Sequence, residues 1–163
     1  MPIELRPAKV EDVPLVLALI RELAEYERAP NAVHATEGMI AHALFPAAGA
    51  PTAECTIGLI DGVAQGFALY YHNFSSWVGK RGLYLEDLFV RPGARGRGLG
   101  KALLERVAQI AVERGCDRLD WVVVDWNTPA VEFYTRMGAK AQSEWTIFRA
   151  EGGALEVMAK GNG

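Results

Sequence analysis

The chain has 163 residues, half of them hydrophobic and 23% charged, with a formal net charge of −3. Its length and composition predict one globular domain over residues 1–163, and the mildly acidic balance argues against nucleic acid as a partner. We find no apolar run of about 18 residues that would span a membrane and no basic, apolar leader, so the sequence predicts a cytoplasmic protein with no membrane partner.

The first third of the chain predicts a strand and two helices. A short strand over Ile3–Arg6 is followed by apolar residues at three- and four-residue spacing, which predict a helix from about Glu11 to Glu27. Thr36 belongs to the residue types that cap helix N-termini, and apolar residues after it predict a second, short helix.

A β-hairpin is expected next. Asp61-Gly62 stands between the apolar runs Cys55–Ile60 and Val63–Tyr71, and Asp-Gly between two such runs is a strong signal for a two-residue turn. The segment from Asn73 to Gly82 is interpreted as a connection to the following strand.

The central segment combines a strand, a glycine-rich turn and a helix. Leu83–Val90 is rich in aromatic and branched residues, Pro92-Gly93 breaks the strand, and the apolar residues from Leu99 onward follow a helical period. Glycines at positions 93, 96, 98 and 100 alternate with basic residues, namely Arg91, Arg95, Arg97 and Lys101.

This order predicts an anion site at a helix N-terminus, where backbone amides lack intrahelical partners and glycines allow a close approach. The Walker phosphate loop does not fit, because it would place Arg95 at its first glycine and Ala102 at its hydroxyl residue. The dinucleotide fingerprint does not fit either, because Lys101 replaces its third glycine. The pattern that remains is Arg-x-x-Gly-x-Gly. The alternative is a glycine-rich connection between strand and helix whose arginines are solvated and bind no phosphate.

The last third predicts alternating short elements. Gly115 ends the long helix, Arg118–Asp125 is expected to be a buried strand, and a helix is expected over Ala130–Met137. Two final strands are expected at Trp145–Phe148 and Leu155–Met158. Cysteine and histidine lack ligand spacing, so no metal site is expected.

The chain resembles the GNAT N-acetyltransferase superfamily, and within it the spermidine/spermine N1-acetyltransferase (diamine/thialysine) branch. The resemblance covers essentially the whole chain and implies a mixed α/β fold: a mostly antiparallel sheet of about seven strands flanked by four helices, in the order β-α-α-β-β-β-α-β-α-β-β. The motifs that carry it are Arg6-Pro7-Ala8, Glu22-Leu-Ala-Glu-Tyr26-Glu27, Tyr70-Tyr71, Trp77-x-Gly-Lys80, Leu83-Tyr-Leu-Glu86-Asp87, Arg95-Gly-x-Gly-x-Gly100 and Trp126-Asn127-x-Pro129-x-x-x-Phe133-Tyr134.

The resemblance implies direct transfer of an acetyl group from acetyl-CoA to a primary amine of a small cationic substrate such as a polyamine, diamine or thialysine-like compound. No metal is implied. The residues implied to hold acetyl-CoA are the end of the strand, the loop and one asparagine: Leu88, Phe89, Val90, Arg95, Gly96, Arg97, Gly98, Leu99, Gly100, Lys101 and Asn127.

Two residues are implied to carry the chemistry. Tyr134 matches the family tyrosine that protonates the departing thiolate, since a phenol with a pKa of about 10 keeps its proton at neutral pH. Glu86 matches the branch's acid, as a base or as an anchor for the amine. Strand alternation predicts that Glu86 and Asp87 face opposite sides, which leaves Asp87 to secure the sheet.

The resemblance further implies an amine channel and a homodimer. Tyr26 and Glu27 match channel residues, whereas Glu144 and Trp145 match only with an alignment that can slip by one residue. The dimer is expected to form through the apolar strand Leu155–Met158, because edge strands tend to be paired. A non-catalytic acetyl-CoA-binding module, or an acetyltransferase for an aminoglycoside or a protein N-terminus, remains the alternative.

Overall fold

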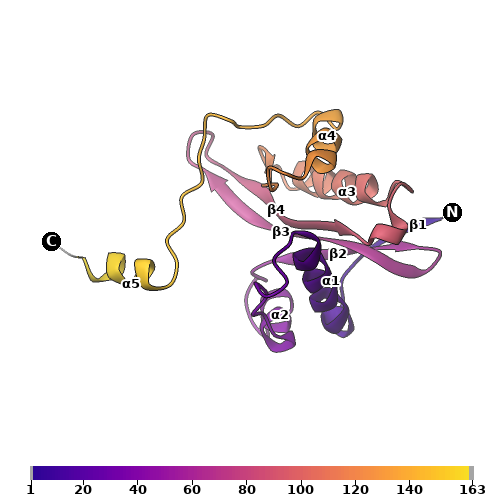
Figure 1. Ribbon diagram of the computed structural model, residues 1–163, viewed down its shortest axis with the longest axis horizontal. Coiled ribbons are helices and arrows are strands. Elements are labelled where there is room, and N and C mark those ends of the chain that lie inside the picture. The colour runs from indigo at the N-terminus through magenta and orange to yellow at the C-terminus, as the bar shows by residue number, and fades with distance from the viewer. Residues whose placement is uncertain (1, 162–163) are drawn as a thin grey trace. The chain divides into compact units, whose positions relative to one another are not determined.

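The computed structural model describes residues 2–161, which form two compact units that divide after Val122. The first unit contains one five-stranded sheet whose strands follow chain order from edge to edge (Figure 1). Its strands are antiparallel except that the last two run parallel. They are β1 (Ile3–Pro7), β2 (Glu54–Ile60), β3 (Val63–Ser75), β4 (Lys80–Val90) and β5 (Leu119–Asp120).

Helices cover both faces of this sheet (Figure 1). On one face, α1 (Val13–Tyr26) and α2 (Glu37–Leu44) pack over β2, β3 and β4 through a buried apolar cluster. On the other face lies α3 (Leu99–Glu113), and Gly58 of β2 makes its close approach possible. A Cβ atom on Gly58 would come within 2.7 Å of a Leu99 methyl carbon.

The local signals in the first unit are confirmed. Thr36 caps α2 by accepting a hydrogen bond from the Met39 amide at 3.2 Å. Asp61 and Gly62 have φ values of 50° and 76°, as the two central residues of a type I′ hairpin turn require. Gly115 follows α3 in the left-handed region, with φ of 68°.

Some boundaries differ from the predictions. The first helix is preceded by a 3-10 turn over Val10–Asp12, so α1 begins two residues later than expected. The predicted connection 73–82 is largely paired strand, because β3 and β4 continue to a tight turn between Ser75 and Lys80. The predicted strand Arg118–Asp125 is reduced to Leu119–Asp120.

The second unit contains α4 (Thr128–Arg136) and α5 (Gly153–Lys160). The prediction of two final strands is wrong: Trp145–Phe148 has no regular structure, and Leu155–Met158 lies inside α5. Ala, Leu, Glu, Met and Lys make up most of α5 and are strong helix formers, so helix propensity outweighs the strand signal of the short apolar run. The described residues therefore hold five strands and five α-helices where about seven and four were expected, while the mixed α/β class is confirmed. Within them, no helix is long and apolar enough to cross a membrane.

Candidate active site

The glycine-rich loop follows β4 and leads directly into α3. A 3-10 turn over Pro92–Ala94 comes first, and then Gly96 and Gly98 have φ values of 77° and 89°. Gly98 is the N-cap residue of α3 and has no side chain to occupy the first-turn amides. The loop therefore has the backbone conformation and the helix N-terminus that a phosphate group needs.

Arg91 ties the start of this loop to α1. Its Nε and Nη2 atoms donate to the two carboxylate oxygens of Glu22, both at 2.9 Å, and its Nη1 donates to the carbonyl oxygen of Ala64 at 3.1 Å. The Arg91 amide also donates to the carbonyl of Gln65 at 2.8 Å. Contacts from α1 and β3 thus converge on one guanidinium group at the exit of β4.

Arg95, in the middle of the loop, lies against α1 as well. Its guanidinium carbon is 4.3 Å from the centre of the Tyr26 ring and 5.7 Å from that of Phe89. Its Nε donates to the carbonyl of Val90 at 2.9 Å. The structure therefore brings together residues that the sequence assigned separately to the cofactor (Arg95, Phe89, Val90) and to the amine (Tyr26).

A β-bulge interrupts the pairing of β4 at its two adjacent acids, Glu86 and Asp87. Leu69 pairs with Asp87 but Tyr70 pairs with Leu85, so Glu86 is an extra residue in the ladder. Asp87 therefore shares the face of Leu69, which packs in the cluster under α1. Tyr71, two residues after Leu69, lies on the same face.

Glu86 itself is exposed, and its charge acts on two neighbouring titratable groups. Burial raises the pKa of both Asp87 and Tyr71, and the negative charge of Glu86 raises both further. The prediction that Glu86 and Asp87 face opposite sides rests on simple alternation, which this bulge interrupts, and it stays a prediction.

Burial and neighbouring charges give Asp87 an unusual proton affinity. Burial, then the charge of Glu86 and then that of Glu27, raise the pKa of Asp87 from its ordinary value of 3.8 to about 7. Partial desolvation also raises the pKa of Glu27, the residue that follows α1. Asp87 can thus exist in both protonation states near neutral pH, and the group of Glu27, Glu86 and Asp87 favours a cation.

Sequence reasoning placed Asp87 in a structural role and missed the effect of the Glu27 charge on it. The Glu-Asp pair at the end of a strand before a glycine loop was a visible signal. The bulge was not visible, because it depends on the register against β3.

Four of the predicted residues belong to the second unit. Asn127 caps α4, where its Oδ1 accepts from the Ala130 amide at 3.4 Å. Tyr134 lies on α4 with its ring centre 5.4 Å from that of Phe133. Glu144 and Trp145 are exposed.

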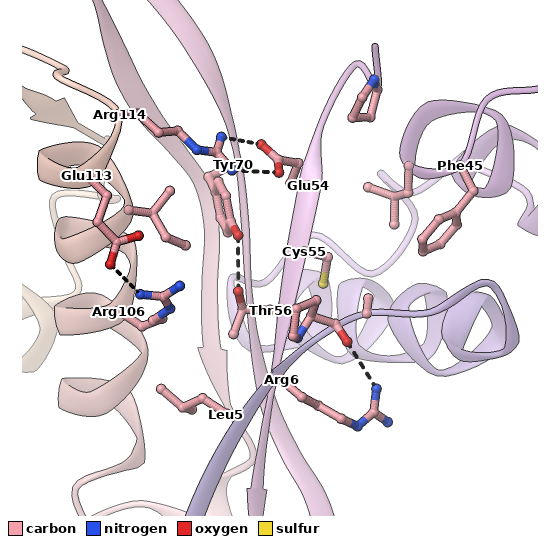
Figure 2. Close-up of a pocket in the computed structure, with 15 residues that line it drawn as sticks. Leu5, Arg6, Phe45, Glu54, Cys55, Thr56, Tyr70, Arg106, Glu113 and Arg114 are labelled. Atoms are coloured by element: carbon pink, nitrogen blue, oxygen red, sulfur yellow. Dashed lines mark hydrogen bonds and ion pairs between the residues drawn. The ribbon is translucent and has the colours of Figure 1, made fainter. Parts of the chain in front are cut away.

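A cavity of about 430 Å³ in the first unit lies elsewhere (Figure 2). None of the predicted site residues lines it. Four of its charged residues pair with one another: Arg114 donates to Glu54 at 2.6 and 2.8 Å, and Arg106 donates to Glu113 at 3.1 Å. These ion pairs link α3 internally and to β2. Across residues 2–161, no group of three or more His, Cys, Asp or Glu side chains could hold a metal ion.

Residues 18–139 match the acetyltransferase (GNAT) family. The chain belongs to this family. The expectation drawn from the motifs is thereby confirmed, and the glycine loop, β4 and the Glu27–Glu86–Asp87 group all lie inside the matched region.

Relatives along nearly the whole chain share the acetyltransferase activity by name. A thialysine N-epsilon-acetyltransferase of Sus scrofa is 36% identical, over 95% of this chain and 96% of the relative. An L-ornithine N5-acetyltransferase of Arabidopsis thaliana is 32% identical, over 97% and 88%. Among solved structures, an integron cassette protein from the mobile metagenome of V. cholerae is 28% identical, covers 99% of both chains and has a TM-score of 0.81.

Proposed function

We propose that this acetyltransferase transfers the acetyl group of acetyl-CoA to the distal primary amine of a basic amino acid of the thialysine or ornithine type. The observation that carries the proposal is a group of carboxyl side chains: β4 places Asp87 opposite Leu69, on the sheet face that α1 covers, and the charges of Glu86 and Glu27 both act on it. A group of this kind attracts an ammonium ion, and the two relatives named above act on distal amines of such amino acids.

Acetyl-CoA supplies an activated thioester whose carbonyl carbon the amine attacks. The exit of β4, residues Leu88–Val90, would hold the acetyl and pantetheine end, and Arg95–Lys101 would hold the pyrophosphate. The positive φ values of Gly96 and Gly98 and the side-chain-free N-cap of α3 support this assignment. Asn127 is proposed to contact the pantetheine arm.

We assign the proton from the substrate ammonium to Asp87, with Glu86 and Glu27 as anchors for the cation. A base is most effective when its pKa lies near the working pH, and among these three carboxyls Asp87 has a pKa of about 7. As the new C–N bond forms, the C–S bond breaks, and the thiolate takes the phenolic proton of Tyr134. Tyr26 is proposed to form a wall of the amine site, whereas Glu144 and Trp145 are assigned to the amine by the resemblance alone.

The homodimer remains part of the proposal, but the strand expected to mediate it is not formed. The homodimer is supported instead by large apolar side chains exposed in the last part of the chain: Trp145 is 71% exposed, Phe148 93% and Leu155 54%. Side chains of this size gain stability when a second copy of the chain covers them.

Thiol release from acetyl-CoA, measured with thialysine, L-ornithine, spermidine and an aminoglycoside, tests the proposed function. We expect the highest kcat/KM with thialysine or L-ornithine, and Asp87→Asn should lower it by about 10²–10⁴-fold. A variant distant from the site, Glu113→Gln, should keep the parent rate. Activity confined to the aminoglycoside, or full activity of Asp87→Asn, would refute the proposal.

A further inference from the structure

The glycine-rich loop, residues 91–101, is joined at two points to the part of α1 that carries Tyr26, the proposed wall of the amine site. One is the ion pair between Arg91 and Glu22, and the other is the stacking of Arg95 on Tyr26. Glu22 lies four residues, about one helical turn, before Tyr26 on α1, so both contacts involve the same stretch of that helix. Arg91 and Arg95 lie on either side of the 3-10 turn Pro92–Ala94.

We propose that Glu22 and Arg91 are a positioning pair that makes the acetyl-CoA and amine sites energetically interdependent. This inference rests on the proposed function of the loop and of the acidic group. A phosphate held by the loop restrains Arg95, whose guanidinium lies over Tyr26, and through Tyr26 it restrains the amine wall. That restraint is transmitted only while the second half of α1 and the loop move as one body, which the Glu22–Arg91 pair ensures.

The geometry of the pair favours such a role over a contribution to stability. It is bidentate, with both distances at 2.9 Å, which fixes orientation as well as separation. The two side chains are 32% and 36% exposed, and ion pairs exposed to that degree add little to the free energy of folding. Its members are 69 residues apart in sequence, so the pair constrains the tertiary arrangement and not α1 itself.

Reciprocity makes the proposal measurable without turnover. If CoA tightens amine binding by some factor, the amine must tighten CoA binding by the same factor. Calorimetry with CoA, which carries no acetyl group, and with whichever of thialysine, L-ornithine and spermidine binds most tightly gives this factor for each variant. We expect a factor of at least about 5 in the parent protein.

Glu22→Gln keeps the size of the side chain but removes its charge and the bidentate contact. We expect its coupling factor to fall below about 2, although both ligands still bind. Glu22→Ala, Arg91→Ala and the double variant should all show the same low factor, since the pair is already broken in each single variant. The matched control is Glu113→Gln, which removes an ion pair of α3 with Arg106 and should keep the parent's factor.

Two results would overturn the inference, and they separate it from the proposed function. If CoA and the amine bind to the parent and Glu22→Gln retains the parent's coupling factor, the positioning role is wrong and the proposed function stands. If neither CoA nor any of the three amines binds to the parent, the proposed function and this inference both fall.

Discussion

Asp87 should make the protein less stable as the pH rises through the neutral range. Its pKa is about 7 in the folded protein and near 3.8 when exposed to water. Between these values the unfolded chain has lost the proton and the folded protein still holds it, so each pH unit lowers the free energy of unfolding by about 1.4 kcal/mol. The stabilisation is complete below pH 3.8 and is lost as the pH approaches 7. Its upper limit is about 4 kcal/mol, from the roughly three-unit difference.

Asp87→Asn removes this titration while retaining the shape of the side chain. Urea unfolding from pH 4 to pH 8 should therefore show the variant gaining stability relative to the parent, by up to about 4 kcal/mol. Asp12→Asn is the control of opposite sign, because its hydrogen bonds with Arg6 hold the pKa of Asp12 below its ordinary value. Stability due to Asp12 is present above that value and lost as the pH falls. Parallel pH profiles for the parent and Asp87→Asn would refute the reasoning.

Three further outcomes are expected. Gly98→Val should raise the Kd of acetyl-CoA at least tenfold in calorimetry, because φ of 89° strains a β-branched residue by about 1–3 kcal/mol and the side chain obstructs the phosphate; an unchanged Kd would remove the loop assignment. Tyr134→Phe should lower kcat by about 10²-fold or more with little change in acetyl-CoA affinity, and an unchanged kcat would exclude Tyr134 as the acid. Gly66→Ala should cost about 1–3 kcal/mol in urea unfolding, since its Cβ would lie 2.5 Å from the carbonyl oxygen of Phe89, whereas Gly93→Ala, with nothing within 4 Å, should cost little.

Local chemistry made much of the first unit predictable. Asp61-Gly62 determines its hairpin turn, Thr36 its helix cap, and the glycines after β4 their loop, because each depends on the backbone preferences of a few adjacent residues. The apolar run Leu155–Met158 was too short for its period to distinguish strand from helix.

The candidate site was predictable only in part, since its decisive features arise from contacts between distant segments. The bulge at Glu86 depends on how β4 pairs with β3, and no residue pattern within β4 alone predicts it. The raised pKa of Asp87 depends on its burial in the fold and on the charges of Glu86 and of Glu27, which is 60 positions earlier in the chain. Glu22 and Arg91 are similarly distant. Motifs located the loop and the acids, whereas their mutual arrangement required the fold.

The most direct test of the central claim is the identity of the acetylated nitrogen. The protein is incubated with acetyl-CoA and thialysine, and separately with L-ornithine, and the products are analysed by mass spectrometry and NMR. We expect one acetyl group on the distal amine, with one equivalent of CoA thiol released per product and no α-N-acetyl compound. Acetylation of the α-amine, or CoA release without an acetylated amino acid, would contradict the assignment of the acidic group to a distal ammonium ion.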